Sequence, residues 1–194
     1  MPVTGVVLAG GRSSRFGTDK ALAPLDGRAL AAHVADALRA ACDEVFAVGG
    51  DEAALTDLGL RYLDDELPGL GPLGGLVTAL AHATHDWVFL AACDLPHLGP
   101  RLVSYLCRAA LEAPQRYDVV APRSKSGHEP LLSLYRRTCL APARARIAAG
   151  TLGMRGFLGT RTVHTLDETT LAAAGIDLAT ATRNINHPRD LEVR

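Results

Sequence analysis

The sequence lacks the features that identify several large classes of protein. Its 194 residues carry 20 basic and 21 acidic side chains, so the chain has no overall positive charge with which to hold nucleic acid by its phosphates. No stretch reaches the ~18 consecutive apolar residues of a membrane span. The segment Met1-Pro2-Val3-Thr4 enters an apolar run without a basic leader. We therefore expect a cytoplasmic protein that binds neither nucleic acid nor membranes.

Cysteine and histidine do not occur in the patterns of metal or thiol sites. The seven histidines form no HxxxH or HExxH pair, so we predict no zinc site and no hydrolase triad. The cysteines include no CxxC pair and no zinc spacing. We predict that they are core residues, since small free thiols are usually buried, and only Cys93 lies beside a suspected site. The four are Cys42, Cys93, Cys107 and Cys139.

Short apolar runs alternate with helical patterns along most of the chain. Val3 to Ala9 is rich in β-branched residues and ends at Gly10-Gly11, which is typical of a strand buried on both faces of a parallel sheet. The alternation predicts one doubly wound α/β domain over residues 1–194. The expected strands cover residues 3–9, 44–48, 60–63, 87–92, 118–121 and 131–135, and the expected helices cover residues 30–41, 73–83 and 101–113.

The loop from Leu8 to Lys20 combines three glycines, three hydroxyls and three cations directly after the first strand. Glycines let backbone N–H groups approach a phosphate, and the cations offset its charge. Lys20 and Lys125 are the only lysines among 20 basic residues, and a compact ammonium suits phosphate oxygens where a planar guanidinium would not fit. We interpret the loop as a phosphate cradle, although it is not a Walker A motif. The alternative is an ordinary basic loop.

Asp94 follows the apolar run Trp87 to Ala92, which places one carboxylate at the carboxyl end of a central strand. In open α/β sheets, ligands bind beyond these strand ends. Mg²⁺ prefers hard oxygen ligands and usually keeps several waters, so one aspartate plus substrate phosphates makes an adequate site. We predict that Asp94 binds Mg²⁺, and the alternative is a turn or helix N-cap aspartate.

A second glycine loop, Gly69 to Gly74, matches GxGxxG and precedes an expected helix. It offers the alternative of a Rossmann dinucleotide site. Pro68 and Pro72 count against this reading because they stiffen the loop and Pro72 lacks an N–H. The preceding Asp64-Asp65-Glu66 supplies carboxylates for a base or ribose, or else forms a solvated acidic loop.

Asn184 and Asn186 occupy alternate positions near the end of the sequence, so both amides face one side if this segment is extended. Paired amides suit a heteroaromatic ligand with donor and acceptor edges. Turn chemistry before a last helix, with Pro188 in its first turn, is compatible with this reading.

Together these motifs resemble those of the molybdenum cofactor guanylyltransferases. The resemblance implies a Rossmann-like nucleotidyltransferase fold. It also implies transfer of GMP from GTP to the phosphate of molybdenum-bound molybdopterin, with Mg²⁺ as cofactor and pyrophosphate as the second product. The product would pass to a molybdoenzyme or a cofactor-delivery protein. The motifs are Leu8-Ala9-Gly10-Gly11, Ser14-Arg15-Phe16-Gly17, Asp19-Lys20, Pro68-Gly69-Leu70-Gly71-Pro72-Leu73, Cys93-Asp94-Leu95-Pro96 and Asn184-Ile185-Asn186.

The resemblance also implies roles for the matching residues. Asp94 would bind both metal and nucleotide, and Lys20 and Arg15 would stabilise the departing pyrophosphate. The acceptor phosphate needs no general base, because its oxygen is already anionic. The nucleotide would contact Leu8, Ala9, Gly10, Gly11, Lys20, Asp65 and Asp94, and the pterin would contact Asn184 and Asn186.

Two positions depart from the family pattern. Ala47-Val48-Gly49 stands where some members have a nucleotide-binding asparagine, and His187 replaces a common threonine. Four other functions stay open: a cytidylyltransferase for the same pterin, a sugar-phosphate nucleotidyltransferase, an NAD-binding oxidoreductase that uses the second glycine loop, and a nucleotide-binding regulatory protein.

Overall fold

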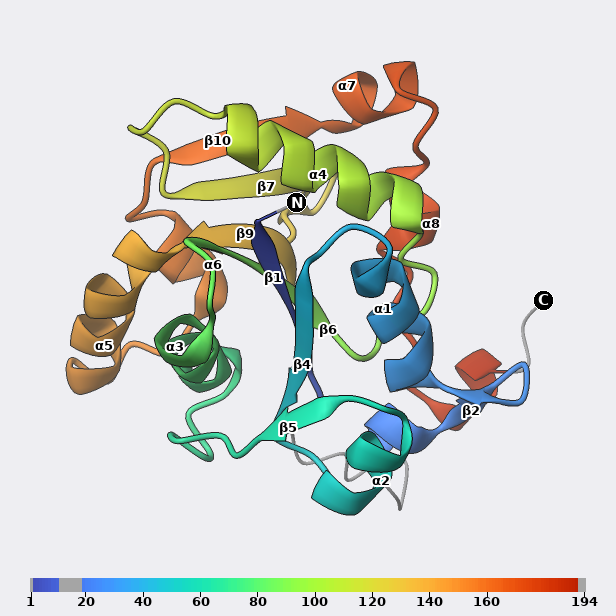
Figure 1. Cartoon of the computed structure of the whole chain (residues 1–194). Coiled ribbons are helices and arrows are strands. Elements are labelled where there is room, and N and C mark those ends of the chain that lie inside the picture. The colour runs from blue at the N-terminus through green and yellow to red at the C-terminus, as the bar shows by residue number, and fades with distance from the viewer. Residues whose placement is uncertain (1, 11–18, 192–194) are drawn as a thin grey trace.

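A central β-sheet organises the molecule in the computed structural model, which describes residues 2–10 and 19–191 (Figure 1). Within these residues the strand order is β10-β7-β9-β6-β1-β4-β5, and β8 pairs with β7 off this path. The strands are β1 (Val3–Leu8), β4 (Glu44–Val48), β5 (Arg61–Leu63), β6 (Trp87–Ala92), β7 (Val119–Ser124), β8 (Gly127–His128), β9 (Leu132–Arg136) and β10 (Val163–Asp167).

Most strand pairs in this sheet are parallel, as the sequence predicted. β1 pairs in parallel with β4 and β6, β5 with β4, and β10 with β7. Two strands are exceptions: β9 runs antiparallel between β6 and β7, and the short β8 pairs antiparallel with β7. The doubly wound α/β prediction is therefore confirmed, while the expected strand at residues 131–135 is present in the reverse direction.

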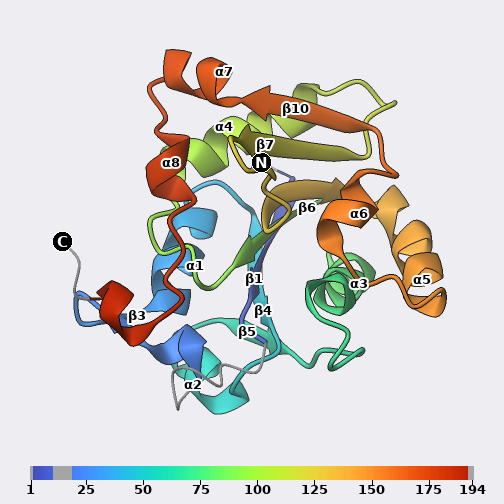
Figure 2. The ribbon, with the colours of Figure 1, turned by 180° about the vertical axis from the view of Figure 1, so that it is seen from behind.

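Helices cover both faces of the sheet. α1 (Leu30–Arg39) and α4 (Pro100–Glu112) lie on one face, and α3 (Pro72–His82), α5 (Leu140–Ala148) and α6 (Met154–Leu158) lie on the other (Figures 1 and 2). The remaining helices are short: α2 (Glu52–Asp57), α7 (Glu168–Ala173), α8 (Leu178–Ala181) and the 3₁₀ turns η1 (Lys20–Leu22), η2 (Arg137–Cys139) and η3 (Pro188–Leu191).

β1 shows why the chain folds as a layered sheet. Successive side chains of a strand point to opposite faces. Val3 and Val7 belong to the core on the α1 side, and Val6 and Leu8 belong to the core on the α3 side. All six residues of β1 are buried, and each large apolar side chain contributes about 1.5–3 kcal/mol when it is fully buried.

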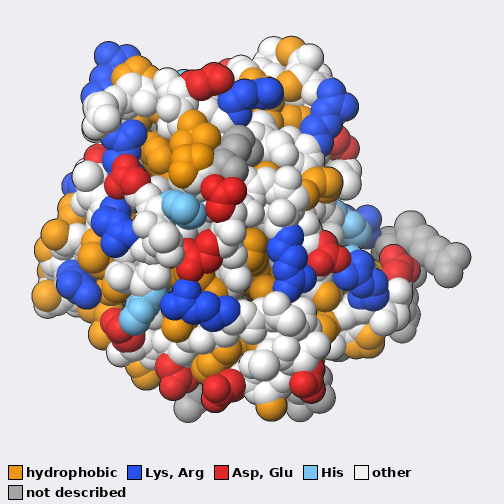
Figure 3. Space-filling view, viewed as in Figure 1, with side chains coloured by type: hydrophobic (Ala, Val, Ile, Leu, Met, Phe, Trp, Pro, Cys, Tyr) orange, Lys and Arg blue, Asp and Glu red, His pale blue; other side chains and the backbone are white. Residues whose placement is uncertain are grey.

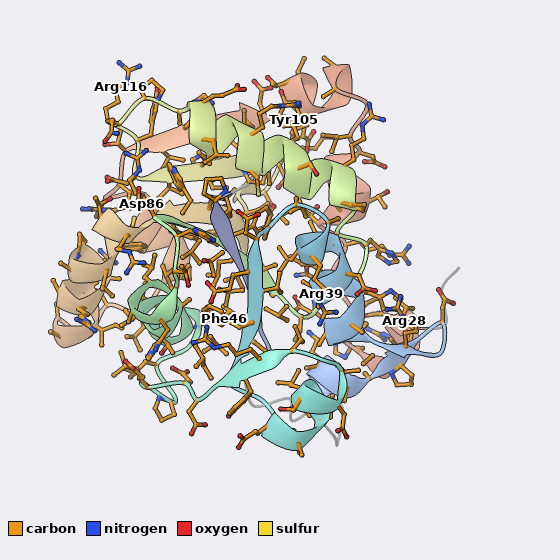
Figure 4. The ribbon with its side chains drawn as sticks, viewed as in Figure 1. Arg28, Arg39, Phe46, Asp86, Tyr105 and Arg116 are labelled. Carbon is orange, nitrogen blue, oxygen red and sulfur yellow. The ribbon has the colours of Figure 1, made fainter. Side chains whose placement is uncertain are left out.

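The side chains of the neighbouring strand and helix follow the same division. Figure 4 shows Phe46 on the α3 side of β4 and Arg39 on α1 at the other face. The four free cysteines are all buried, so their prediction as core residues is confirmed. Gly5 lets α1 pack closely on β1, because a Cβ there would lie 3.1 Å from Cβ of Leu38.

A hairpin absent from the sequence prediction precedes α1. It consists of β2 (Pro24–Leu25) and β3 (Arg28–Ala29), joined by Asp26 and Gly27 with φ values of 51° and 77°. Consecutive positive φ values are required by the tight hairpin turn that Asp-Gly favours. The hairpin matters for the site because Leu25 and Leu30 pack against Ile185 in a small separate core, which fastens the carboxyl-terminal segment beside the hairpin (Figure 2).

Two observations are relevant to the prediction that the protein binds neither membranes nor nucleic acid. Among the described residues, no helix is long and apolar enough to cross a membrane. On the face shown in Figure 3, basic and acidic side chains are interspersed.

Candidate functional site

The carboxyl ends of the parallel strands meet at one edge of the sheet. The amide of Cys93, just after β6, donates to the carbonyl of Leu8 at 3.1 Å. The amides of Ala9 and Gly10 both donate to the carbonyl of Val48, at 3.1 and 3.3 Å. These bonds join the turns after β1, β4 and β6, which are the turns where ligands bind in open α/β sheets.

Lys20 and Asp94 form an ion pair at this edge. Nζ of Lys20 lies 2.8 Å from Oδ2 of Asp94, and the two side chains are 18% and 20% exposed. The residues are 74 positions apart in the sequence, but the parallel pairing of β1 and β6 brings their segments together. The structure therefore places side by side the cation and the carboxylate that the sequence singled out separately. Asp94 does not cap α4, whose N-cap residue is Gly99.

The carboxyl-terminal segment completes this cluster. Oδ1 of Asn186 accepts a hydrogen bond from Nζ of Lys20 at 3.0 Å, and the amide of Ile185 donates to the carbonyl of Asp94 at 3.0 Å. Ile185 is buried while Asn184 and Asn186 are exposed, as the alternation predicted. The amide of Asn186 thus borders the Lys20–Asp94 pair, and Asn184 is exposed two residues before it.

A structural role for the same segment is also present. Oδ2 of Asp190 accepts hydrogen bonds from the amides of Asn186 and His187, both at 2.8 Å, and η3 follows. The turn chemistry expected near Pro188 therefore coexists with exposed asparagine amides.

The glycine turns after β1, at Gly10, and after β4, at Gly49, lie against each other. Cβ built on Gly49, which has a φ of 69°, would lie 3.0 Å from Cα of Gly10, so the two backbones approach too closely for a side chain at this position. The amides of Ala9 and Gly10 are already donated within the sheet. Residues 11–18 of the predicted phosphate cradle, among them Gly11 and Arg15, lie outside the described residues.

Asp19 belongs to the Asp19-Lys20 motif, and the structure gives it a role that the motif alone did not indicate. Its Oδ1 accepts from the amide of Ala21 at 2.9 Å, and its Oδ2 accepts from the amide of Asp51 at 3.1 Å. The side chain thereby caps η1 and ties it to the turn after β4, which fixes the position of Lys20. The signal was an aspartate directly before a turn, where its side chain commonly binds the backbone two residues on.

The three carboxylates after β5 have different partners. Asp64 accepts from the hydroxyl of Tyr62 at 2.6 Å, and this bond raises the pKa of Tyr62 to about 12. Glu66 pairs with His82 at 2.6 Å on the surface. Asp65 lies beside the turn of Gly49, since a Cβ built on Gly49 would lie 3.8 Å from Cβ of Asp65.

The second glycine loop is explained by backbone geometry. Gly69 and Gly71 have φ values of 83° and 67°, which favour glycine. Gly71 is the N-cap of α3 and Pro72 its first residue, a common helix start. A Cβ on Gly74 would lie 2.8 Å from the carbonyl oxygen of Leu67, so this glycine lets α3 pack against the loop. The backbone conformation of the loop and the packing of α3 thus account for the three glycines of the GxGxxG pattern.

The donors at the edge suit a hard cation shared with a substrate. Asp94 supplies carboxylate oxygens, and no group of three or more His, Cys, Asp or Glu side chains suitable for a metal occurs in the part of the chain that the structure describes. A cation here would need most of its ligands from phosphate and water, which is usual for Mg²⁺. Burial raises the pKa of the neighbouring Cys93 thiol to about 12, so this thiol is neutral at physiological pH.

Comparisons with known proteins identify the family of this chain. The family described as "MobA-like NTP transferase domain" matches residues 5–166. A probable molybdenum cofactor guanylyltransferase of Pelotomaculum thermopropionicum is 35% identical, over 98% of this chain and 91% of the relative. A molybdenum cofactor guanylyltransferase of Desulfosudis oleivorans is 32% identical, over 98% of this chain and 93% of the relative.

Solved structures show the same fold. The crystal structure of molybdopterin-guanine dinucleotide biosynthesis protein A from Archaeoglobus fulgidus superposes with a TM-score of 0.81 at 24% identity. The match covers 97% of this chain and 95% of that one. The arrangement of the sheet is therefore that of a Rossmann-like nucleotidyltransferase.

Proposed function

The chain belongs to the molybdenum cofactor guanylyltransferase family, with a MobA-like NTP transferase domain, and from this premise we propose that it transfers GMP from GTP to molybdenum-bound molybdopterin. The observation that carries the proposal is the cluster of Lys20, Asp94 and Asn186 at the carboxyl edge of β1 and β6. It combines a cation for phosphates, a carboxylate for a metal, and an amide for the acceptor at one place.

The proposed reaction is a substitution at the α-phosphorus of GTP. An anionic oxygen of the acceptor's phosphate monoester forms a bond to this phosphorus, and the bond to the bridging oxygen of the β-phosphate breaks, so pyrophosphate leaves with the electron pair. The nucleophile has no proton to lose, so the site does not need a general base. Its tasks are to hold the reactants in line and to stabilise the charge on the phosphates.

Lys20 is the described residue best suited to the charge on the triphosphate. Its side chain is 18% exposed and its ammonium is held by Asp94 and Asn186, so the charge is fixed in direction. Pre-organised charges cost less reorganisation when negative charge develops on the leaving group. Arg15, from the same loop, is proposed as a second cation.

Nucleotidyltransferases of this family use a divalent metal, and we propose Mg²⁺ held by Asp94. The ion would be held by Asp94 and would neutralise part of the charge on the phosphates. One carboxylate with surrounding room for phosphate and water fits this ion. The pair with Lys20 holds the carboxylate in place at the strand end.

Asp65 is proposed to bind the nucleotide on the other side of β1. Guanine presents N1–H and the N2 amino group as adjacent donors, and a carboxylate accepts from both. Cytosine presents an acceptor at the corresponding edge, which a carboxylate repels. Asn184 and Asn186 are proposed to bind the pterin, whose ring also has donor and acceptor edges.

The proposal is tested with purified protein, Mg²⁺, molybdenum-loaded molybdopterin and one nucleotide at a time. We expect a pterin guanine dinucleotide and an equal amount of pyrophosphate from GTP, and much less product from CTP, ATP or UTP. A preference for CTP would instead indicate a cytidylyltransferase. Transfer to sugar phosphates but not to molybdopterin would contradict the proposed acceptor.

A further inference from the structure

Thr78 is a fully buried polar residue in the middle of α3, where the other buried residues are apolar or glycine. Its hydroxyl oxygen accepts a hydrogen bond from the amide of Glu66 at 3.1 Å. It also lies 3.2 Å from Oδ1 of Asp65 and 3.3 Å from the carbonyl oxygen of Gly74. A hydroxyl has one proton to donate, and a charged acceptor forms the stronger bond, so the proton goes to Asp65.

The carboxylate of Asp65 is held through one of its two oxygens. Oδ1 accepts from Thr78 and also from the amide of Leu67 at 3.0 Å. Two donors in different directions fix the plane of the carboxylate. Neither of these bonds uses Oδ2, which is therefore left to accept from a ligand. The carboxylate stands near the turn of Gly49, because a Cβ built on Gly49 would lie 3.8 Å from Cβ of Asp65.

One stripe of α3 supports the whole loop that carries Asp65. Gly74, Thr78 and His82 are four residues apart, so they lie on the same side of the helix. Gly74 admits the carbonyl of Leu67, Thr78 binds Asp65 and the amide of Glu66, and His82 pairs with the Glu66 side chain. The opposite side of α3 packs in the core through Leu73, Leu76 and Leu80, which makes the helix a rigid support.

We propose that Thr78 is a positioning residue for nucleotide recognition, which orients Asp65 toward the guanine base. This inference rests on the proposed guanylyl transfer and on the proposed role of Asp65 in it. Lys20 and Asp94 lie across β1 and β4 from this loop and do not contact Thr78. Loss of the hydroxyl should therefore weaken nucleotide binding and discrimination while the chemical step is retained.

The central test compares Thr78→Val, which removes the hydroxyl at nearly constant shape, with Thr78→Ser, which keeps it. A hydrogen bond to a charged group is the strong kind, so we expect Thr78→Val to raise KM for GTP by about tenfold. The kcat/KM ratio of GTP over CTP should fall by a similar factor, and kcat should stay within about threefold. Thr78→Ser should restore both KM and the ratio.

Thr4 offers a matched control. It is fully buried in β1 at the opposite edge of the sheet, donates to Oε2 of Glu44 at 2.9 Å, and accepts from the amide of His85 at 3.3 Å. Thr4→Val should lower thermal stability but leave KM and the nucleotide ratio unchanged. If Thr78→Val changes stability alone, as Thr4→Val does, the positioning role is wrong.

Dependence on Asp65 separates this proposal from a general packing effect. Asp65→Ala should itself narrow the preference for GTP over CTP, and Thr78→Val should then add nothing to that loss. A further loss in the double variant would overturn the inference. Two different measurements test the two proposals. Failure of the wild type to modify molybdopterin contradicts the proposed function. Equilibrium binding of GTP and CTP without acceptor tests Thr78, and an unchanged preference for GTP over CTP in Thr78→Val contradicts its role.

Discussion

The ammonium of Lys20 pairs with one anion in the structure, Asp94, and would meet a second, the triphosphate, in the proposed function. In the structure it binds Asp94 and Asn186, and a triphosphate would offer it further oxygens of higher total charge. The pair is partly buried, so removal of either charge leaves the other without its closest compensation. Single substitutions here therefore act on the electrostatics of the site as well as on one contact.

Asp94→Asn is expected to preserve the fold and to reduce turnover on the order of 10²-fold. An amide oxygen has the shape to keep the hydrogen bond from Lys20, but it is a poorer Mg²⁺ ligand than a carboxylate. The measurement is kcat over a Mg²⁺ titration, with the melting temperature as a check on folding. Retained activity at every Mg²⁺ concentration would remove Asp94 from the metal site.

Lys20→Ala should lower kcat/KM by on the order of 10²-fold or more if the ammonium stabilises charge on the departing phosphates. Lys125→Ala is the matched control, because Lys125 is exposed on the turn between β7 and β8 and is expected to be nearly silent. Equal effects of the two variants would argue against a phosphate role for Lys20.

At the scale of secondary structure, the buried parallel strands could be predicted and the small irregular pieces could not. β4 and β6 begin and end at the expected residues, because a short apolar run bounded by polar or glycine residues is typical of a strand buried in a parallel sheet. The hairpin at Asp26-Gly27 was missed although this dipeptide favours the turn, since its strands have two residues each and carry no periodicity.

The candidate site could be predicted as a set of residues but not as a set of contacts. Lys20 stood out because lysine is scarce in this sequence, and Asp94 because it follows a buried strand. Their pairing, however, depends on β1 lying next to β6. Thr78 was missed because one threonine in an apolar helical run looks like a tolerated core residue. Only the path of the loop after β5 shows that its hydroxyl reaches Asp65.

Glu44 connects three segments at the edge of the sheet opposite the site. It accepts hydrogen bonds from the hydroxyl of Thr4 at 2.9 Å and the amide of Thr84 at 3.1 Å, and it pairs with Arg61 at 2.7 Å. Partial burial raises the pKa of this carboxyl, but the bonds from Thr84 and Thr4 and the charge of Arg61 outweigh burial. The net effect is a pKa below its usual value.

A lowered carboxyl pKa makes stability depend on pH in a defined direction. The folded state binds the proton less tightly than the unfolded state, so Glu44 stabilises the fold above its unfolded pKa of about 4.3, and this contribution is lost as pH falls through the folded pKa. Glu44→Gln should therefore be less stable than the wild type at pH 7, by a margin that shrinks as the pH falls below about 4. Urea unfolding at several pH values measures the difference in unfolding free energy between the wild type and the variant. A difference that does not change with pH would contradict the prediction.

At the scale of the whole molecule, the order of the strands decides which segments share the site. The order β6-β1-β4-β5 places Asp94 and Lys20 on one side of the glycine turn and Asp65 on the other. The carboxyl-terminal segment then reaches the first group because Ile185 is anchored beside the β2–β3 hairpin. A nucleotide bound across this edge would contact the segments after β1, β5 and β6, which are far apart in the sequence, so its binding should stabilise the folded state.

Thermal unfolding with different nucleotides tests this coupling. A ligand at about 100 times its Kd stabilises the folded state by roughly 2.7 kcal/mol, which for a chain of this size corresponds to a rise of roughly 5–10 °C in Tm. We expect GTP with Mg²⁺ to give the largest shift, CTP, ATP and UTP smaller ones, and NAD none. Asp94→Asn should keep part of the GTP shift but lose its dependence on Mg²⁺, because the triphosphate would still meet Lys20. A shift with NAD that does not need Mg²⁺ would instead favour a dinucleotide site at the second glycine loop, and equal shifts for all four triphosphates would mean that Asp65 does not read the base.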